Sequence, residues 1–245
     1  RLVIGAPLFY IRVQTAYLGS DCRCRRTGGC MVANWSNGQD PGEFYSQFKT
    51  YHELMPHKVR EILLVSSPYD AYIMEEDGSL AARISNEYSG LNLSQPPRVT
   101  RTASAEEAVA LLAHKSFDLV LTMPYLEEMD ACRLGVRIKQ QCPDLPVILL
   151  AHSMRSIAPL PEDGHCEGID KVFIWTGNSD LLMAMVKNVE DRLNAKADTR
   201  KAQVRVLILV EDSPAYYSSF LPLIYKEIVR QTQVVLGSGL NEEHR

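Results

Sequence analysis

FDLVLTMPYLEEMDA, residues 117–131, is the stretch that decides the predicted fold. Its first six residues have the length and apolar content of a buried strand in a parallel sheet. EEMDA lies in the loop that follows, and DACRLGVRIKQQ, which starts at Asp130, has the pattern of a helix. A strand, a short loop and a helix form the repeating unit of α/β domains, so this stretch predicts an α/β fold.

The same alternation of strands and helices continues on both sides of that stretch. Ser104 followed by Glu107 is a capping box at the start of a predicted helix. Residues 153–169, by contrast, contain prolines and glycines that argue against a regular helix. Strands alternating with helices predict a doubly wound domain with a parallel sheet. The predicted strands are EILLVS (61–66), PRVTRTA (97–103), FDLVLT (117–122), DLPVILLAH (144–152) and DKVFIW (170–175).

Composition narrows the classes of function. The chain has 245 residues, of which 46% are hydrophobic, and a formal net charge of -4. This mild acidity argues against nucleic acid as a partner, because a phosphate-binding face needs a basic surplus. The apolar start of the chain is interrupted by Arg12 and Gln14, so neither a signal peptide nor a membrane span is expected there. No membrane partner is expected.

The six cysteines indicate neither a metal site nor a disulfide framework. Cys132, Cys142 and Cys166 lie singly in patterned α/β sequence, which is typical of reduced thiols in a cytoplasmic protein. CRCRRTGGC, residues 22–30, offers three cysteines, but a structural zinc site needs four ligands and the arginines between them disfavour a cation. His152 is expected to be a surface or loop residue.

An internal repeat divides the chain. VREILLVSSPYDAY, starting at Val59, aligns without a gap on VRVLILVEDSPAYY, starting at Val204. A second copy of the domain therefore begins near Val204. The predicted organisation is an extension over 1–57 with a short helix at 43–55 and partial disorder, a domain over 58–197, a charged linker over 198–203, and a truncated second copy over 204–245.

LILVEDSP, residues 207–214, resembles the opening of a response-regulator receiver domain. The resemblance implies a flavodoxin-like, five-stranded doubly wound sheet with its site at the carboxyl ends of the strands. It also implies two acids that hold Mg²⁺ beside an acceptor aspartate, with a Ser or Thr and a Lys contacting the phosphoryl group. Glu211 and Asp212 are then the candidate Mg²⁺ ligands of the second copy, where the alternative is a pair of exposed acids at a strand end.

In the first copy the resemblance places an unsuitable residue at each of these positions. The acid pair falls on Ser66 and Ser67, the acceptor on Met123, the hydroxyl on Ala151 and the Lys on Trp175. Methionine cannot form an acyl phosphate, and two serines with a thioether do not supply the charged oxygens that Mg²⁺ needs. The first domain is therefore predicted to be a pseudo-receiver, neither phosphorylated nor carrying a cofactor.

From Phe44 to Arg245 the chain is also similar to the amino-terminal regulatory part of bacterial phosphoenolpyruvate synthase or pyruvate phosphate dikinase-like proteins. That resemblance implies a non-enzymatic regulatory region of a two-component or phosphorelay type. Its partners would be other protein domains, either a carboxyl-terminal catalytic module or a kinase. A homodimer is a further expectation, through the sheet edge or the stripe Leu181, Leu182, Met185, Val186 and Val189.

Two other functions stay open. The protein could be a phosphorylatable response regulator that acts through the second copy, or a small-ligand-binding domain that uses the space between Ser66, Met123 and Ala151. About forty residues cannot close a receiver core alone. The second copy is therefore expected to pack on the first domain, to exchange with a neighbouring chain, or to stay mobile.

Overall fold

The computed structural model describes residues 9–13, 55–75, 80–90, 95–127, 129–157, 166–202 and 205–242. Its strands are β1 (Phe9–Val13), β2 (Glu61–Val65), β3 (Arg98–Thr102), β4 (Leu119–Thr122), β5 (Val147–Ala151), β6 (Lys171–Ile174) and β7 (Arg205–Leu209). Its helices are α2 (Pro68–Glu75), α3 (Leu80–Gly90), α4 (Ala105–His114), α5 (Ala131–Gln141), the short 3-10 helix η1 (Met154–Ile157), α6 (Asp180–Ala202) and α7 (Pro214–Glu242). Except for Met55, the predicted helix over 43–55 lies outside the described residues.

Five of the strands form one parallel sheet in the order β3-β2-β4-β5-β6. Counted within the domain, this order is 2-1-3-4-5, which is that of flavodoxin-like folds. The predicted α/β class, the five strands and the doubly wound sheet are therefore confirmed. Strands β4 and β5 are buried at every position, as expected for parallel strands covered on both faces.

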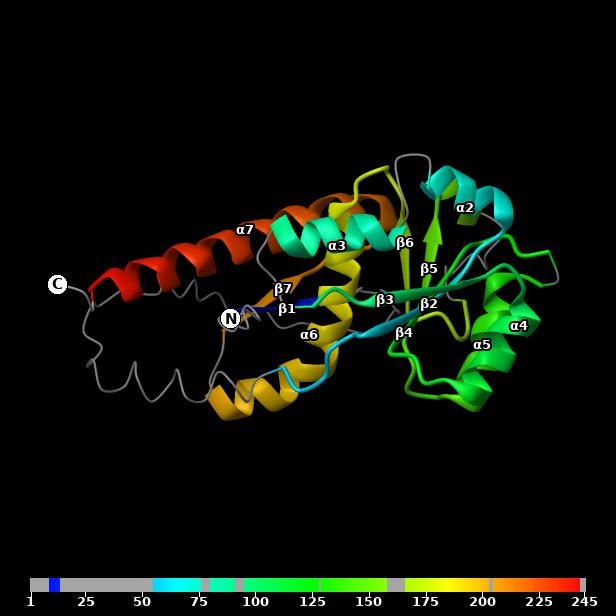
Figure 1. The fold of residues 1–245 in the computed structure, drawn as a ribbon, viewed down its shortest axis with the longest axis horizontal. Helices are drawn as coiled ribbons and strands as arrows, with labels where there is room; N and C mark the ends of the chain where they lie inside the picture. The colour runs from blue at the N-terminus through cyan, green and yellow to red at the C-terminus, as the bar shows by residue number, and fades with distance from the viewer. Residues whose placement is uncertain are drawn as a thin grey trace, which may run out of the picture.

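Helices cover both faces of this sheet (Figure 1). Helices α3, α6 and α7 pack on one face, where Ile62, Leu121 and Phe173 belong to the buried cluster. Helices α4 and α5 pack on the other face around Leu63 and Val120. Ser104 caps α4 as predicted, and its side chain accepts a hydrogen bond from the amide of Glu107.

Helix α6 is longer than the sequence pattern predicts. The apolar stripe ends near Asn194, and residues 198–203 are charged enough to read as a linker, but the helix continues through Ala202. Its last turns are not solvated on all sides, because residues Met55–Val59 lie against them, and the amides of Met55 and His57 donate hydrogen bonds to the side chains of Asp198 and Asn194. Tertiary contacts therefore outweigh the linker-like composition.

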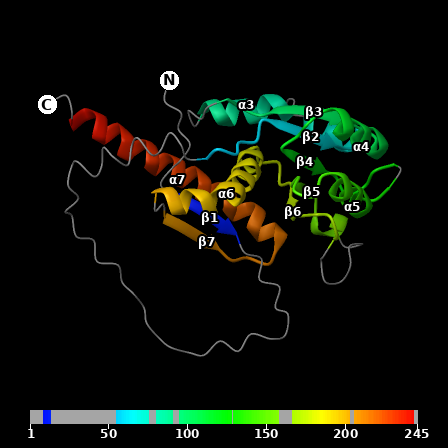
Figure 2. The same ribbon diagram turned by 90° about the horizontal axis from the view of Figure 1, so that it is seen from below.

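The stretch that aligns on the first domain as a second copy begins with β7, which pairs in parallel with β1 as a separate two-stranded sheet (Figure 2). The register runs from Phe9 opposite Arg205 to Val13 opposite Leu209. The sequence assigns residues 9–13 to the extension and predicts no strand there. Five residues are too few to show a period, and the partner strand lies at the other end of the chain.

Helix α7 belongs to the core of the first domain. Tyr217 and Leu221 are buried in the same cluster as Phe173, and the rings of Tyr217 and Phe173 lie 5.3 Å apart. The Oγ of Ser218 accepts a hydrogen bond of 2.8 Å from the backbone amide of Ile174 in β6. Because β6 is an edge strand, α7 covers an edge that would otherwise present unpaired backbone groups. Of the three expected arrangements, packing on the first domain is the one observed.

The structure also pairs two of the cysteines. Cys132 and Cys166 form a disulfide, with Cα atoms 5.4 Å apart, and Cys142 remains free. The prediction that Cys132 and Cys166 are single reduced thiols is therefore wrong, because the fold brings together residues that lie 34 apart in the chain.

In the described part of the chain, the helices fall short of the length and apolar content that crossing a membrane requires.

Candidate functional site

The predicted site positions lie together at the carboxyl edge of the sheet. Ser66 follows β2, Met123 follows β4, and Ala151 ends β5. The amide of Met123 donates to the carbonyl of Val65 at 3.1 Å, which places the end of β4 beside the end of β2. The amide of Trp175, just after β6, donates to the carbonyl of Ala151 at 2.7 Å. The structure thus brings Ser66, Met123, Ala151 and Trp175 to one edge, as the alignment requires.

This edge is filled by apolar side chains. Ser66, Met123 and Ala151 are each 0% exposed, and Met123 and Trp175 belong to the same apolar cluster. The Oγ of Ser66 is buried without a hydrogen-bond partner among the described residues. A hydroxyl and a thioether do not supply the charged oxygen ligands of Mg²⁺, so the residues present do not fit that ion.

A polar cluster that sequence reasoning missed lies beside these residues. Asp70, in the first turn of α2, is 8% exposed and accepts a hydrogen bond of 2.9 Å from Oγ of Ser67. Its other carboxylate oxygen lies 3.2 Å from Nε2 of His152, which directly follows β5. His152 is therefore a half-buried partner of Asp70 rather than a simple surface residue, and only the strand register could have revealed this.

The arrangement of this cluster does not create a nucleophile. A catalytic Ser must touch the His that removes its proton, with the carboxylate on the far side of the imidazole. Here Asp70 stands in the middle and contacts both Ser67 and His152. The Oγ of Ser67 also accepts from the amide of Asp70 at 3.1 Å. The cluster therefore caps α2 and joins it to the end of β5.

The acids of the second copy, Glu211 and Asp212, follow β7. Glu211 is half-buried and its Oε1 accepts a hydrogen bond of 2.9 Å from the amide of Ser213, whereas Asp212 is exposed. One carboxylate is thus occupied by the backbone turn before α7. Among the described residues there is no cluster of three or more His, Cys, Asp or Glu side chains placed to hold a metal ion.

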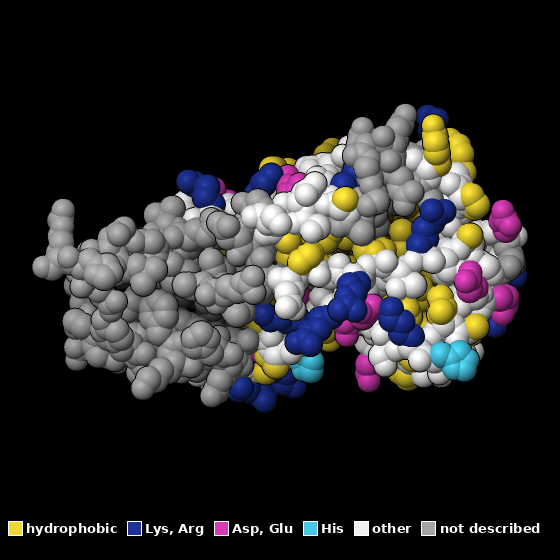
Figure 3. Space-filling model, in the orientation of Figure 1, with side chains coloured by type: hydrophobic (Ala, Val, Ile, Leu, Met, Phe, Trp, Pro, Cys, Tyr) yellow, Lys and Arg dark blue, Asp and Glu magenta, His cyan; other side chains and the backbone are white. Residues whose placement is uncertain are grey.

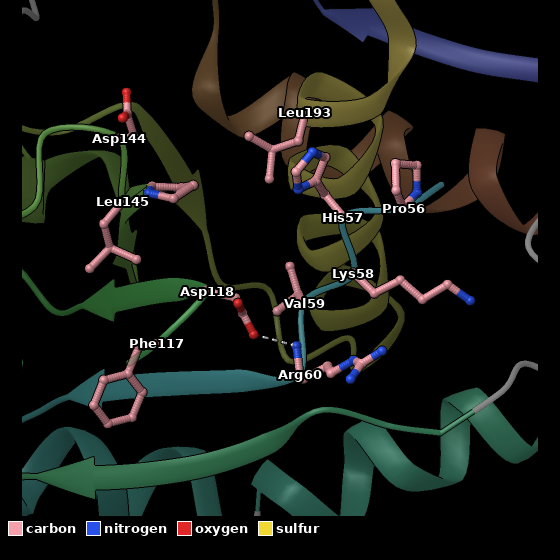
Figure 4. A pocket seen from close by; sticks show the side chains of 11 residues that line it. Pro56, His57, Lys58, Val59, Arg60, Phe117, Asp118, Asp144, Leu145 and Leu193 are labelled. Carbon is pink, nitrogen blue, oxygen red and sulfur yellow. Dashed lines mark hydrogen bonds between the residues drawn. The ribbon is translucent and has the colours of Figure 1, made fainter. Parts of the chain in front are cut away.

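A groove of about 590 Å³ lies at the opposite, amino-terminal edge of the sheet (Figure 4). Leu145 and Leu193 lie on its walls, with His57 beside Leu193. The carboxylate of Asp118 accepts from the backbone amides of Arg60 and Glu61 at 2.8 and 2.9 Å. This groove is therefore remote from Ser66, Met123 and Ala151, and the carboxylate of Asp118 in it is bonded to the backbone.

Comparison with known proteins finds similarity to solved structures only. No family model matches the chain, and no curated protein matches it. The signal receiver domain of an HD domain-containing protein from Pseudomonas fluorescens Pf-5 is 24% identical, with 58% of this chain and 94% of that one covered and a TM-score of 0.39. The signal receiver domain of a histidine kinase from Syntrophus aciditrophicus is 26% identical, with 55% and 92% covered and a TM-score of 0.39.

A third similar structure is the amino-terminal domain of a response regulator/sensory box/GGDEF 3-domain protein from Carboxydothermus hydrogenoformans. It is 21% identical, with 56% of this chain and 99% of that one covered and a TM-score of 0.43. The strand order of the five-stranded sheet itself fixes the architecture. The first domain has a receiver-like, flavodoxin-like fold. These similarities carry no statement about phosphorylation.

Proposed function

We propose that residues 58–197 are a non-catalytic pseudo-receiver, a regulatory and docking module that is not phosphorylated. The observation that carries the proposal is Met123, a fully buried methionine at the strand end where the acceptor aspartate of a receiver would stand. A thioether at this point has neither the nucleophilic oxygen nor the charge that acyl phosphate formation requires.

The neighbours of Met123 support the same proposal. Ser66 and Ser67 replace the acids that would hold Mg²⁺, and the aromatic ring of Trp175 replaces a cation. The nearby carboxylate of Asp70 is already paired with Ser67 and His152. Among the described residues at this edge, a phosphoryl group would meet neither an acid pair to hold a metal ion nor a Lys just after β6 to balance its charge.

For docking, the surface around the carboxyl edge is more suitable than the closing helix. The stripe Leu181, Leu182, Met185, Val186 and Val189 in α6 is buried in the core. Tyr69 and Tyr72 on α2 are instead 71% and 70% exposed, and apolar side chains lie at the surface where α2 is located (Figure 3). Exposed tyrosines are enriched at protein interfaces, which favours another protein domain as the partner.

The proposal also covers the catalytic partner that this module would regulate. By resemblance of sequence alone, it would regulate a kinase or a phosphoenolpyruvate synthase or pyruvate phosphate dikinase-type catalytic module in the cytoplasm. The reading frame around the gene tests this point directly. A catalytic module of that type in the same frame would support it, and its absence would limit the proposal to the pseudo-receiver itself.

The test of the central claim is intact mass after incubation with acetyl phosphate and Mg²⁺, with a phosphorylatable receiver domain treated in parallel. We expect the control to gain a phosphoryl group and this chain to gain none. A stoichiometric adduct that peptide mapping places within residues 58–197 would contradict the proposal. An adduct within 205–245 would instead indicate a response regulator acting through the second copy.

A further inference from the structure

The disulfide between Cys132 and Cys166 joins two parts of the first domain. Cys132 is the second residue of α5, close after the loop that follows Met123. Cys166 begins a turn that leads into β6. Their Cα atoms lie 5.4 Å apart, within the range for a disulfide. The bond therefore attaches the approach to β6 to the helix beside the degenerate site.

The turn lies directly on the backbone of α5. The amide of Ile169 donates to the carbonyl of Cys166 at 3.0 Å, and Gly168 has a φ of +86°. Gly168 touches Gly135 of α5 so closely that a Cβ on Gly135 would lie 2.8 Å from the Gly168 carbonyl oxygen. Two glycines make this approach possible, and the disulfide lies one helical turn away from it.

The far end of the turn is anchored independently. Asp170 accepts a hydrogen bond of 2.8 Å from the amide of Val147 and forms ion pairs with Lys139 at 2.6 Å and Arg192 at 3.1 Å. In the described part of the chain, no backbone–backbone hydrogen bond joins residues 166–168 to α5. We therefore expect that breaking the disulfide loosens Cys166–Gly168, while Asp170 keeps β6 in place.

The two cysteines differ in burial. Cys166 is 3% exposed, whereas Cys132 is only half-buried at the first turn of α5. In the proposed step, an incoming thiolate attacks Sγ of Cys132, the less buried residue. A sulfur–sulfur bond forms there, the old one breaks, and its electron pair goes to Sγ of Cys166, which takes a proton. A second thiol then attacks the mixed disulfide and releases Cys132 as a thiolate, which the amide groups at the start of α5 stabilise.

We propose that Cys132–Cys166 is a reversible redox site, and that its reduction by a dithiol or by glutathione-type thiols detaches the turn Cys166–Gly168 from α5. The reductant is oxidised to its disulfide and the protein gains two thiols. In calling this the input of a regulatory module, the inference rests on the proposed function. Both apolar clusters on the sheet are built largely from other residues, so reduction changes one local contact instead of unfolding the domain.

The experiment compares the full chain, air-oxidised and after treatment with dithiothreitol, by alkylation with peptide mapping and by hydrogen exchange. Cys132→Ser serves as a permanently reduced variant. Cys142→Ser is the matched control, because Cys142 lies at the other end of α5 and is free. We expect a linked peptide containing Cys132 and Cys166 in the oxidised chain. On reduction we expect the Ile169 amide to exchange faster, on the order of tenfold.

In the supporting result, Cys132→Ser behaves like the reduced chain and Cys142→Ser like the untreated one. Three results would overturn the inference. Alkylation of both cysteines before reduction would show that no disulfide forms. Unchanged exchange at Ile169 would show that the bond holds nothing in place, and faster exchange throughout the sheet would make it a purely structural cross-link. Because the phosphorylation assay is separate, a phosphoryl adduct would refute the proposed function without changing these results.

Discussion

The backbone amide of Val59 donates a hydrogen bond of 3.0 Å to Oε1 of Glu190, a residue 131 positions later in the chain. The amide of His57 donates in the same way to Asn194, and the amide of Met55 to Asp198. Alternate residues of an extended segment thus pair with side chains spaced four apart along α6. This polar ladder satisfies backbone amides that lie before the start of β2.

The ladder predicts that replacing Asn194, its central side chain, lowers the stability of the protein strongly. Asn194 is fully buried, accepts from the His57 amide at 3.0 Å and donates to the His57 carbonyl at 2.6 Å. We expect Asn194→Ala to lower the free energy of unfolding by about 2–3 kcal/mol, because both backbone groups lose their partner. Urea denaturation measures this, with the exposed Lys196→Ala as control. A loss equal to that of the control would show that water replaces the side chain.

Helix α7 is predicted to stabilise the first domain. Leu221 is fully buried against that domain, whereas Leu223 on the same helix is 61% exposed. We expect Leu221→Ala to cost about 2–5 kcal/mol of unfolding free energy. Leu223→Ala should cost less than about 0.5 kcal/mol. The midpoint of denaturation followed by Trp fluorescence reports on both variants. Equal effects would mean that α7 does not belong to this core.

Because α5 and the turn before β6 approach each other closely, we expect alanine to destabilise the protein to different extents at two glycines. Gly168 and Gly177 both have a positive φ, of +86° and +80°. A Cβ on Gly168 would lie 2.3 Å from the backbone of Gly135, whereas one on Gly177 would meet nothing within 4 Å. We expect Gly177→Ala to lower the free energy of unfolding by about 1–2 kcal/mol, from the backbone conformation alone. Gly168→Ala should lower the melting temperature clearly more than Gly177→Ala does. Similar melting temperatures for the two variants would show that the turn can move away from α5 freely.

Lys171 predicts how stability depends on pH. Burial, with a smaller effect of Arg192, lowers the pKa of Lys171 to about 8. Between that value and the ordinary pKa of Lys, the unfolded chain binds more protons at this residue than the folded one. This residue's contribution to stability therefore rises with pH from about 8 to 10, by at most about 1.4 kcal/mol per pH unit. Its amine lies 3.7 Å from the centroid of the Tyr217 ring, which offsets part of the cost of burial.

The measurement is the difference in unfolding free energy between the natural chain and Lys171→Met at several pH values. We expect the variant to be the more stable one near pH 7 and its advantage to shrink towards pH 10. Using the difference removes the contributions of Lys58 and of the buried tyrosines, which titrate in both proteins. A difference that stays constant with pH would refute the lowered pKa.

The sequence predicts those features that depend on local pattern. Apolar runs and helical periods give the five strands of the sheet, and spacing within one strand–loop unit places Met123 at a strand end. The features that it misses depend on contacts between distant residues. The pairing of β1 with β7, the disulfide and the contact of Asp70 with His152 join residues whose proximity exists only after folding. Their residue types alone carry no signal of this kind.

The pairing of β1 with β7 also constrains the order of events during synthesis. Val13 leaves the ribosome about 200 residues before its partner Leu209. At roughly 5–20 residues per second, Phe9–Val13 would wait on the order of 10–40 seconds for a strand to pair with. The parallel sheet from β2 to β6 can assemble within that interval. Among the strands that the structure describes, the first in the sequence is therefore one of the last to find its place.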